Sequence, residues 1–218
     1  CTITNCVVKN SSVTGGSNLT GGLIGYSGTA VSKCAVIDTT VSGTEYVGGL
    51  IAQVGKAVTE CYTLHVTVTA TGDYAGGLIG GGNASDIANC FVRGGSVTGD
   101  GYVGGVIGDG GSYSKAKIKT TYAVADVTAG TGEFGPLAGG SYVTITTASS
   151  FYCSDSALTG KDSGKNTTGT PKTTAELKDA AILTKLGSAF GIYAGADGLK
   201  NAGFPYLLNA PALPVIQP

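Results

Sequence analysis

The sequence predicts an all-β protein: a parallel β-helix solenoid of five rungs of about 28 residues, with a small C-terminal cap that contains a helix. Two observations support this prediction. The 218 residues include 38 glycines, far above the average content of about 7%, yet the chain is 42% hydrophobic with a formal net charge of −1, which argues against disorder. In addition, several short motifs recur together at nearly constant spacing along residues 1–153.

The first recurring motif is a pair of glycines followed by two aliphatic residues. It occurs at 21–25, 48–52, 76–80 and 104–108, and in a degenerate form with Pro136 at 135–139. The first residues of these copies are 27, 28, 28 and 31 positions apart. Two other motifs keep the same step. Cysteines stand at Cys6, Cys34, Cys61 and Cys90, with Thr121 in the fifth place, and a Val-Thr-Gly-like segment follows each of them at 12–15, 40–43, 67–70, 96–99 and 126–129.

Each copy consists of short β-branched segments separated by glycine-rich or polar bends. No segment of residues 1–153 has ten residues of helical periodicity, so the pattern does not fit alternating strands and helices. A four-stranded propeller blade takes about 40 residues, whereas three strands in one turn of a β-helix fit the observed length better. Equivalent residues then stack about 4.8 Å apart, and we expect interior ladders of Cys, Val and Leu or Ile.

The two ends of the array differ. Ile3 to Cys6 is the end of a rung whose beginning is missing, so we expect an open edge that takes further rungs, a preceding domain of the same parent chain, or another copy packed end to end.

Residues 154–208 have a different composition and are predicted to form the cap. Thr173 and Glu176 form a capping box, which predicts a helix from about Thr174 to Gly187. Its apolar face, formed by Leu177, Ala181, Ile182 and Leu186, is expected to close the interior above the last rung. Residues 161–171 are predicted to be a polar connection, and residues 209–218, with three prolines, a linker.

The repeats resemble the GLUG-motif family. Asn89-Cys90-Phe91-Val92, Val97-Thr98-Gly99 and Val103-Gly104-Gly105-Val106-Ile107-Gly108 match its repeat, and the tail matches at 150–152, 168–178, 186–190 and 203–207. The resemblance covers nearly the whole chain. It implies a secreted or surface-exposed bacterial protein, since such repeats occur in adhesin-like proteins and in non-catalytic parts of IgA-specific metalloendopeptidases. It implies no catalytic residues.

Composition limits the classes of partner. A nearly neutral chain without a Lys and Arg cluster lacks the footprint of nucleic-acid binding, and its apolar runs are too short to span a bilayer. We expect no cofactor. The partners that we expect are a host glycan or protein, together with further domains of the parent chain. The favoured function is an extracellular, non-catalytic module for adhesion or spacing; a carbohydrate-active β-helix enzyme is the alternative, and an ice-binding face a remote third.

The cysteines have two interpretations. An even number in a secreted chain suggests disulfides. Because Cys6, Cys34, Cys61 and Cys90 share one repeat position, however, a ladder of small buried thiols explains them without bonding, and in-register side chains do not easily reach the disulfide torsion. Cys34, Cys61 and Cys90 are therefore predicted to be reduced and buried. Cys1 and Cys153 lie outside this ladder.

Candidate catalytic and metal-binding residues are few. His65 stands alone in a polar bend, which provides neither a zinc site nor a nucleophile and base pair. Glu45, Asp73 and Asp100 could meet on one side of the solenoid as the acids of a glycosidase or lyase, or as a weak Ca²⁺ site. They stand in glycine-rich bends, so we expect neither a catalytic nor a metal site.

The candidate ligand-binding residues are Tyr46, Tyr74 and Tyr102, each two residues before the repeated glycine pair. If Val47, Ala75 and Val103 point inward, alternation turns the tyrosines outward and builds an aromatic strip three rungs tall. Such a strip could bind a sugar chain or a protein. The alternative is that the rings only shield the neighbouring backbone.

Overall fold

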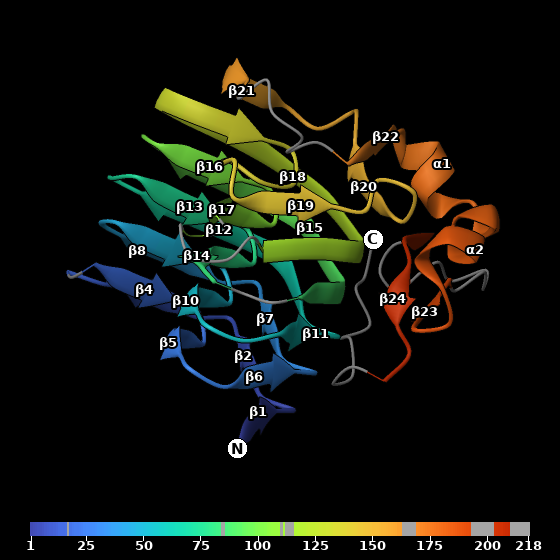
Figure 1. Cartoon of the computed structure of the whole chain (residues 1–218), viewed down its shortest axis with the longest axis horizontal. Coiled ribbons are helices and arrows are strands. Elements are labelled where there is room, and N and C mark those ends of the chain that lie inside the picture. Colours follow the sequence, from blue (N-terminus) through green and yellow to red (C-terminus); the bar gives the residue numbers. More distant parts are fainter. Residues whose placement is uncertain are drawn as a thin grey trace.

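The computed structural model describes residues 1–16, 18–83, 86–109, 111, 116–162, 169–192 and 203–209, and they form a parallel β-solenoid with a short, partly helical C-terminal segment. The predicted linker lies outside the described residues beyond Asn209. In Figure 1 the rungs rise from the N-terminus at the bottom to β21 at the top, and the C-terminal segment lies along one side. The predicted fold class is confirmed.

Equivalent strands pair in parallel, so each rung contributes to five columns of stacked strands. The first column contains β1 (Thr2–Thr4), β6 (Ala30–Ser32), β11 (Val58–Thr59), the starts of β15 (Ile87–Gly99) and β18 (Ala116–Gly135), and β19 (Val143–Ile145). The second, which follows the cysteines, contains β2 (Val7–Lys9), β7 (Ala35–Ile37), the start of β12 (Tyr62–Ala70), the middle of β15 and β18, β20 (Ser150–Cys153) and β22 (Thr170–Lys172).

The other three columns complete the rung. The third contains β3 (Ser12–Thr14), β8 (Thr40–Gly43), the ends of β12 and β15, a later part of β18 and β21 (Leu158–Asp162). The fourth contains β4 (Leu19–Gly21), β9 (Tyr46–Gly48), β13 (Tyr74–Gly76), β16 (Tyr102–Gly104) and the end of β18. The fifth contains β5 (Ile24–Ser27), β10 (Ile51–Val54), β14 (Ile79–Gly82) and β17 (Ile107–Asp109). The expectation of three strands per rung was therefore too low.

The corners between columns explain the extra strands. The residue before each ladder cysteine, and Thr120 before Thr121, adopts a left-handed backbone, at Asn5, Lys33, Glu60, Asn89 and Thr120. A second left-handed corner follows the cysteine strand, at Asn10, Asp38 and His65. Asparagine, aspartate and histidine are enriched in this conformation, but Lys33, Glu60 and Thr120 are not of these types, so the composition alone did not identify the corners.

The repeated glycine pair is required by close packing of the backbone. A Cβ on Gly48 would lie 1.8 Å from the carbonyl oxygen of Ile51, across a tight bend of the same rung. A Cβ on Gly49 would lie 2.1 Å from the carbonyl oxygen of Gly77 in the next rung. The first glycine therefore permits the bend, and the second permits the rungs to approach to hydrogen-bonding distance.

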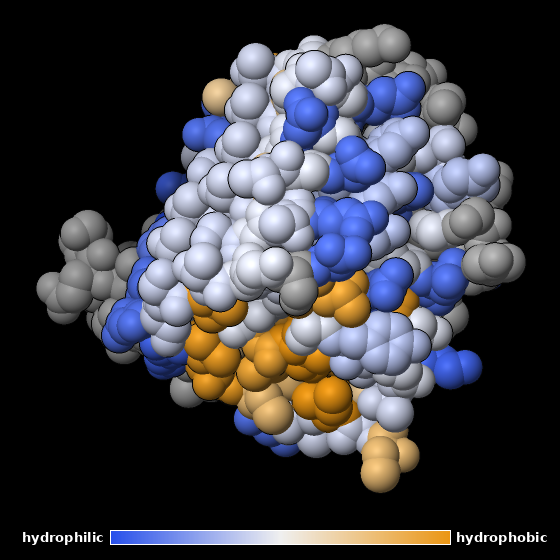
Figure 2. Space-filling view, turned by 90° about the vertical axis from the view of Figure 1, so that its left-hand side faces the viewer, coloured by the Kyte–Doolittle hydropathy of each residue, from blue (hydrophilic) through white to orange (hydrophobic). Residues whose placement is uncertain are grey.

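The interior is one continuous apolar core. The side chains at its centre are fully buried in the middle rungs and come from all five columns, including Val58, Cys61, Val68, Ala75 and Ile79. In the first rung the equivalent residues Ile3, Cys6, Val13 and Ile24 are only partly buried, and the equivalent of Ala75 is the buried Thr20. Figure 2 shows apolar residues gathered at the lower, N-terminal end of the face that it displays.

The C-terminal segment corrects two expectations. The helix begins at the predicted capping box but is broken into α1 (Thr174–Lys178), the 3₁₀ turn η1 (Ala180–Ile182) and α2 (Leu183–Leu186), because Asp179 is extended and its side chain caps the next turn. Ala181 is exposed, so its expected burial was wrong. Two short strands follow, β23 (Phe190–Gly191) and β24 (Tyr206–Leu207).

The segment also covers a side of the solenoid rather than the end of its interior. Leu177, Ile182 and Leu186 join a second apolar cluster, separate from the interior core. Its centre is an outward aromatic ladder of Tyr62, Phe91, Tyr122 and Phe151, one position after each ladder cysteine or its replacement. Alternation along the strand places these rings outside the coil, and burying them accounts for the lateral position of the segment.

Candidate ligand-binding site

The three candidate tyrosines lie in register on the outer surface. Tyr46, Tyr74 and Tyr102 begin β9, β13 and β16 and are paired in neighbouring strands. The following residues, Val47, Ala75 and Val103, are fully buried in the interior core. We call the three rings the tyrosine strip.

The rings of the tyrosine strip stack directly on one another. Their centroids are 4.4 Å apart between Tyr46 and Tyr74 and 5.6 Å apart between Tyr74 and Tyr102, with interplanar angles of 9° and 15°. The ring faces between them are therefore used within the stack. A ligand therefore meets the ring edges and the hydroxyl groups of the strip.

One ring also covers backbone. A Cβ on Gly81 of β14 would lie 3.0 Å from the ring carbons of Tyr46, so this glycine lets the ring lie against the next column. Shielding of the backbone is thus a real role of Tyr46. The strip still remains accessible, since Tyr46 and Tyr74 are half-buried and Tyr102 keeps 37% of its surface exposed.

A hollow of about 220 Å³ adjoins the strip. It is lined by Tyr46, Gln53, Tyr74, Gly82, Asn83, Asp109 and Gly111. Gln53 and Asp109 come from the fifth column, and their strands β10 and β17 flank β14 on either side. The hollow therefore has phenol, amide and carboxylate groups on its walls, which together can donate and accept hydrogen bonds.

Electrostatics keep the phenols of this hollow protonated. Burial, followed by the charge of neighbouring groups that include Asp109 and Asp73, raises the pKa of Tyr74 to about 12. Burial also raises the pKa of Tyr46, and the carboxylate of Glu45 adds to the effect. At neutral pH both phenols are protonated and hydrogen-bond to each other, so the pair can present a hydroxyl to a ligand oxygen but is not poised as a base.

The cysteine ladder makes a repeated hydrogen bond that the sequence did not reveal. Each thiol donates to the carbonyl two residues earlier, across the left-handed corner: Cys34 to Ser32, Cys61 to Thr59 and Cys90 to Ala88, at 3.2–3.3 Å. Thr121 makes the same bond with its hydroxyl, to Lys119 at 2.9 Å. The position therefore selects a small side chain that carries a donor, which explains why threonine replaces cysteine in the fifth rung.

The structure places no disulfide among the described cysteines. Cys34, Cys61, Cys90 and Cys153 are buried, Cys6 is partly exposed, and Cys1 is exposed. Burial raises the pKa of the Cys61 thiol, and it raises that of Cys90 to about 12. These two thiols are therefore protonated and poorly nucleophilic at neutral pH. Cys34 differs, because its hydrogen bond with the Cys61 side chain lowers the pKa of the Cys34 thiol.

The carboxylates near the strip, Glu45, Asp73 and Asp100, lie in bends of the chain. Asp73 and Asp100 are exposed, and one oxygen of Asp100 accepts hydrogen bonds from the backbone N–H and the hydroxyl of Thr131, at 3.0 and 3.2 Å. This carboxylate holds the bend of the next rung. His65 is likewise a corner residue, with Nδ1 lying 3.1 Å from Asp38 one rung below, a pair that the sequence analysis missed.

Metal ions and membranes are two further kinds of partner that the described residues can be compared with. Among the described residues, no group of three or more His, Cys, Asp or Glu side chains is arranged to hold a metal ion. In the same part of the chain, no helix has the length and apolar character needed to cross a membrane.

Comparisons with known proteins support the fold. The chain resembles a crystal structure described as a "putative immunoglobulin A1 protease" from Bacteroides ovatus, with a TM-score of 0.58 over 93% of this chain and 75% of that one. The two sequences are 17% identical, so the likeness is one of fold. No family model matches the sequence, and the GLUG resemblance stays a prediction. The curated proteins also contain no match. The chain thus shares its solenoid architecture with that bacterial protein.

Proposed function

We propose that this chain is a non-catalytic, extracellular repeat module of a bacterial surface or secreted protein, and that its tyrosine strip binds a glycan. The observation that carries the proposal is the hollow beside the strip, where the stacked Tyr46 and Tyr74 meet Gln53 and Asp109. The extracellular setting rests on the resemblance of the repeats to the GLUG family. The shared fold with the Bacteroides ovatus protein is compatible with it.

The geometry favours a hydroxyl-rich ligand over an apolar one. Because the ring faces are stacked, the strip offers edges and phenol groups, and the hollow adds amide and carboxylate groups. Sugar hydroxyls both donate and accept hydrogen bonds and match these groups, whereas an apolar peptide side chain offers them no hydrogen bond. A glycan is therefore the proposed partner, and a host protein is the other outcome that the test distinguishes.

A glycan array and an array of host proteins, both probed with the labelled protein, test this proposal. We expect glycan binding that falls at least about tenfold when Tyr46, Tyr74 and Tyr102 are together changed to Ala, because two or more hydrogen bonds and the strip's edge contacts are lost. Tyr206→Ala is the matched control, since Tyr206 lies in β24, across the molecule from β13 and β16 (Figure 1).

The outcomes separate the functions. Circular dichroism and the thermal midpoint must show that the triple variant is folded. Unchanged glycan binding in a folded triple variant rejects the strip as the site, and binding to host proteins alone would replace the glycan by a protein partner. Hydrolysis or elimination of a polysaccharide by the wild-type chain, abolished by Asp73→Asn or Asp100→Asn, would contradict the non-catalytic assignment.

A further inference from the structure

The outward aromatic ladder stops one rung before the solenoid does. Tyr62, Phe91 and Tyr122 stack with centroid separations of 4.7 and 5.3 Å, and Phe151 occupies the next position. One rung further, in β22, the residue paired with Phe151 is Thr170. A threonine thus stands where the repeat would place a fifth ring.

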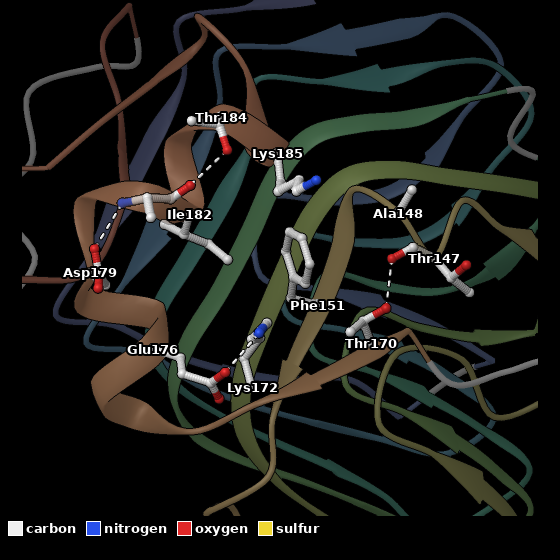
Figure 3. A pocket seen from close by; sticks show the side chains of 11 residues that line it. Thr147, Ala148, Phe151, Thr170, Lys172, Glu176, Asp179, Ile182, Thr184 and Lys185 are labelled. Atoms are coloured by element: carbon white, nitrogen blue, oxygen red, sulfur yellow. Dashed lines mark hydrogen bonds and ion pairs between the residues drawn. The ribbon is translucent and has the colours of Figure 1, made fainter.

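A pocket of about 510 Å³ lies at this end of the ladder, between the last strands and the helical turns. Figure 3 shows the Phe151 ring at its centre, with Ile182 on the helical side and Thr147 and Thr170 on the side of the solenoid. The Thr170 hydroxyl is turned away to donate to the Thr147 carbonyl, at 2.7 Å. The site of the missing ring is therefore open space, and Phe151 lies beneath it with only 3% of its surface exposed. Its volume is within the range of small-molecule sites.

The rim of the pocket is polar and balanced in charge. Lys172 pairs with Glu176 at 2.7 Å, and one oxygen of Asp179 accepts the backbone N–H of Ala181 at 2.9 Å. Lys185 contributes a free ammonium group, with no hydrogen bond or ion pair to any described residue. Two lysines and two acids thus surround the aromatic base, together with the hydroxyls of Thr170 and Thr184.

We propose that this pocket is a carbohydrate subsite that holds one neutral pyranose ring against Phe151 and Ile182, in the place of the absent fifth ring of the ladder. Phe151 and Ile182 are 3% and 5% exposed, so they form the floor of the pocket and touch one edge of the sugar, while the sugar hydroxyls accept from Lys185 and donate to Asp179. The balanced rim gives no net attraction to an anionic sugar. An aromatic peptide side chain fits the base of the pocket equally well but satisfies none of the rim, so the sugar is favoured.

The site is independent of the tyrosine strip, and its test uses a reporter inside the pocket. Methyl glycosides of glucose, galactose, mannose and N-acetylglucosamine are titrated into protein with ¹³C-labelled isoleucine methyl groups. We expect at least one glycoside to shift the Ile182 methyl signal in a saturable way, while Ile51, fully buried in the interior core, does not move.

Two variants keep the proposal falsifiable. Thr170→Phe places the chain's own ring on Phe151, and we expect it to abolish the Ile182 shift while the thermal midpoint holds or rises. Lys185→Ala removes an exposed donor, and we expect about tenfold weaker binding without a change in fold. Should Thr170→Phe fail to fold, the Lys185 variant alone decides.

The opposite results are equally specific. The proposal is overturned if none of the four glycosides moves the Ile182 signal up to the limit of solubility, or if the shift persists at full strength in both variants. N-acetylphenylalanine amide serves as the competing probe. A saturable Ile182 shift with this compound and none with the glycosides would assign the pocket to an aromatic peptide side chain instead.

Discussion

Two aromatic ladders run along this solenoid, and they differ in what covers them. The ladder of Tyr62, Phe91, Tyr122 and Phe151 is buried beneath the C-terminal segment, whereas the rings of the tyrosine strip are half-buried or, at Tyr102, exposed. Both arise from the same rule, that one residue type repeated at one position stacks in register. The comparison shows that the same stacking is compatible with very different exposure: the covered ladder is part of the second apolar cluster, and the more exposed strip carries the proposed glycan site.

The largest difference between the ladders is expected in stability. Tyr122 is fully buried, so Tyr122→Ala should lower the free energy of unfolding by about 3–5 kcal/mol, the range for large-to-small changes of buried aromatic residues. Tyr74→Ala, at a half-buried ring, should cost about 1–2 kcal/mol, through its two stacking contacts. Urea unfolding of both variants provides the comparison, and equal losses would show that the two ladders contribute alike to the fold.

A smaller loss of stability is expected when one hydrogen bond between the C-terminal segment and the covered ladder is removed. The Tyr122 hydroxyl donates to the Pro205 carbonyl, so Tyr122→Phe keeps the ring and removes this bond. We expect a loss of about 1–2 kcal/mol, because a buried carbonyl is left with one partner fewer. Tyr46→Phe is the matched change on the open strip, where water can replace the partner, and its cost should be close to zero. A similar cost in both variants would mean that the Pro205 contact does not fasten the segment.

The smallest expected effect is a pH dependence of local stability in the C-terminal segment. The Lys172 ammonium, 2.7 Å from Glu176, and the backbone N–H of Thr173 lower the pKa of Glu176 from 4.5 to about 2. A lowered pKa means that the folded state favours the charged form. The stabilisation is therefore complete above pH 4.5 and is lost as the pH falls toward 2.

Hydrogen exchange between pH 5 and pH 3 can follow this change. The amide of Leu177, which donates to the Thr173 carbonyl in the first helical turn, should lose protection on acidification after correction for intrinsic rates. Amides of the middle rungs, such as that of Val58, should keep theirs. Glu176→Gln should reduce the pH dependence of Leu177 to the part that comes from Asp155, whose pKa is lowered by the hydrogen bond from the Thr174 backbone N–H. A pH dependence of full size in that variant would mean that Glu176 does not stabilise the helical turns.

The sequence predicted the features that depend on alternation and on spacing. Repeats at 27 to 31 residues predicted the solenoid, and Val47, Ala75 and Val103 predicted the outward tyrosines. The capping box also lies where it was expected. These features follow from local rules, since a strand alternates with period two and a helix begins at a capped turn.

The features that the sequence did not predict depend on contacts between distant segments. The covered ladder was visible in the sequence as Phe91 and Tyr122, each one position after the cysteine or its replacement, but its cover comes from residues 174–207. The left-handed corners at Lys33 and Glu60 have no compositional signal. The stacking of the tyrosine strip was expected, but its ring separations of 4.4 and 5.6 Å came only from the structure.

The central claim is that the tyrosine strip binds its ligand through hydroxyl groups. The most direct test is a variant in which Tyr46, Tyr74 and Tyr102 are all changed to Phe. This change keeps the stacked rings and removes only three hydroxyl groups. The glycan that binds the wild-type protein on the array is titrated by calorimetry into both proteins. We predict an affinity at least about tenfold weaker in the variant, with an unchanged thermal midpoint. Equal affinity in the two proteins would contradict the account.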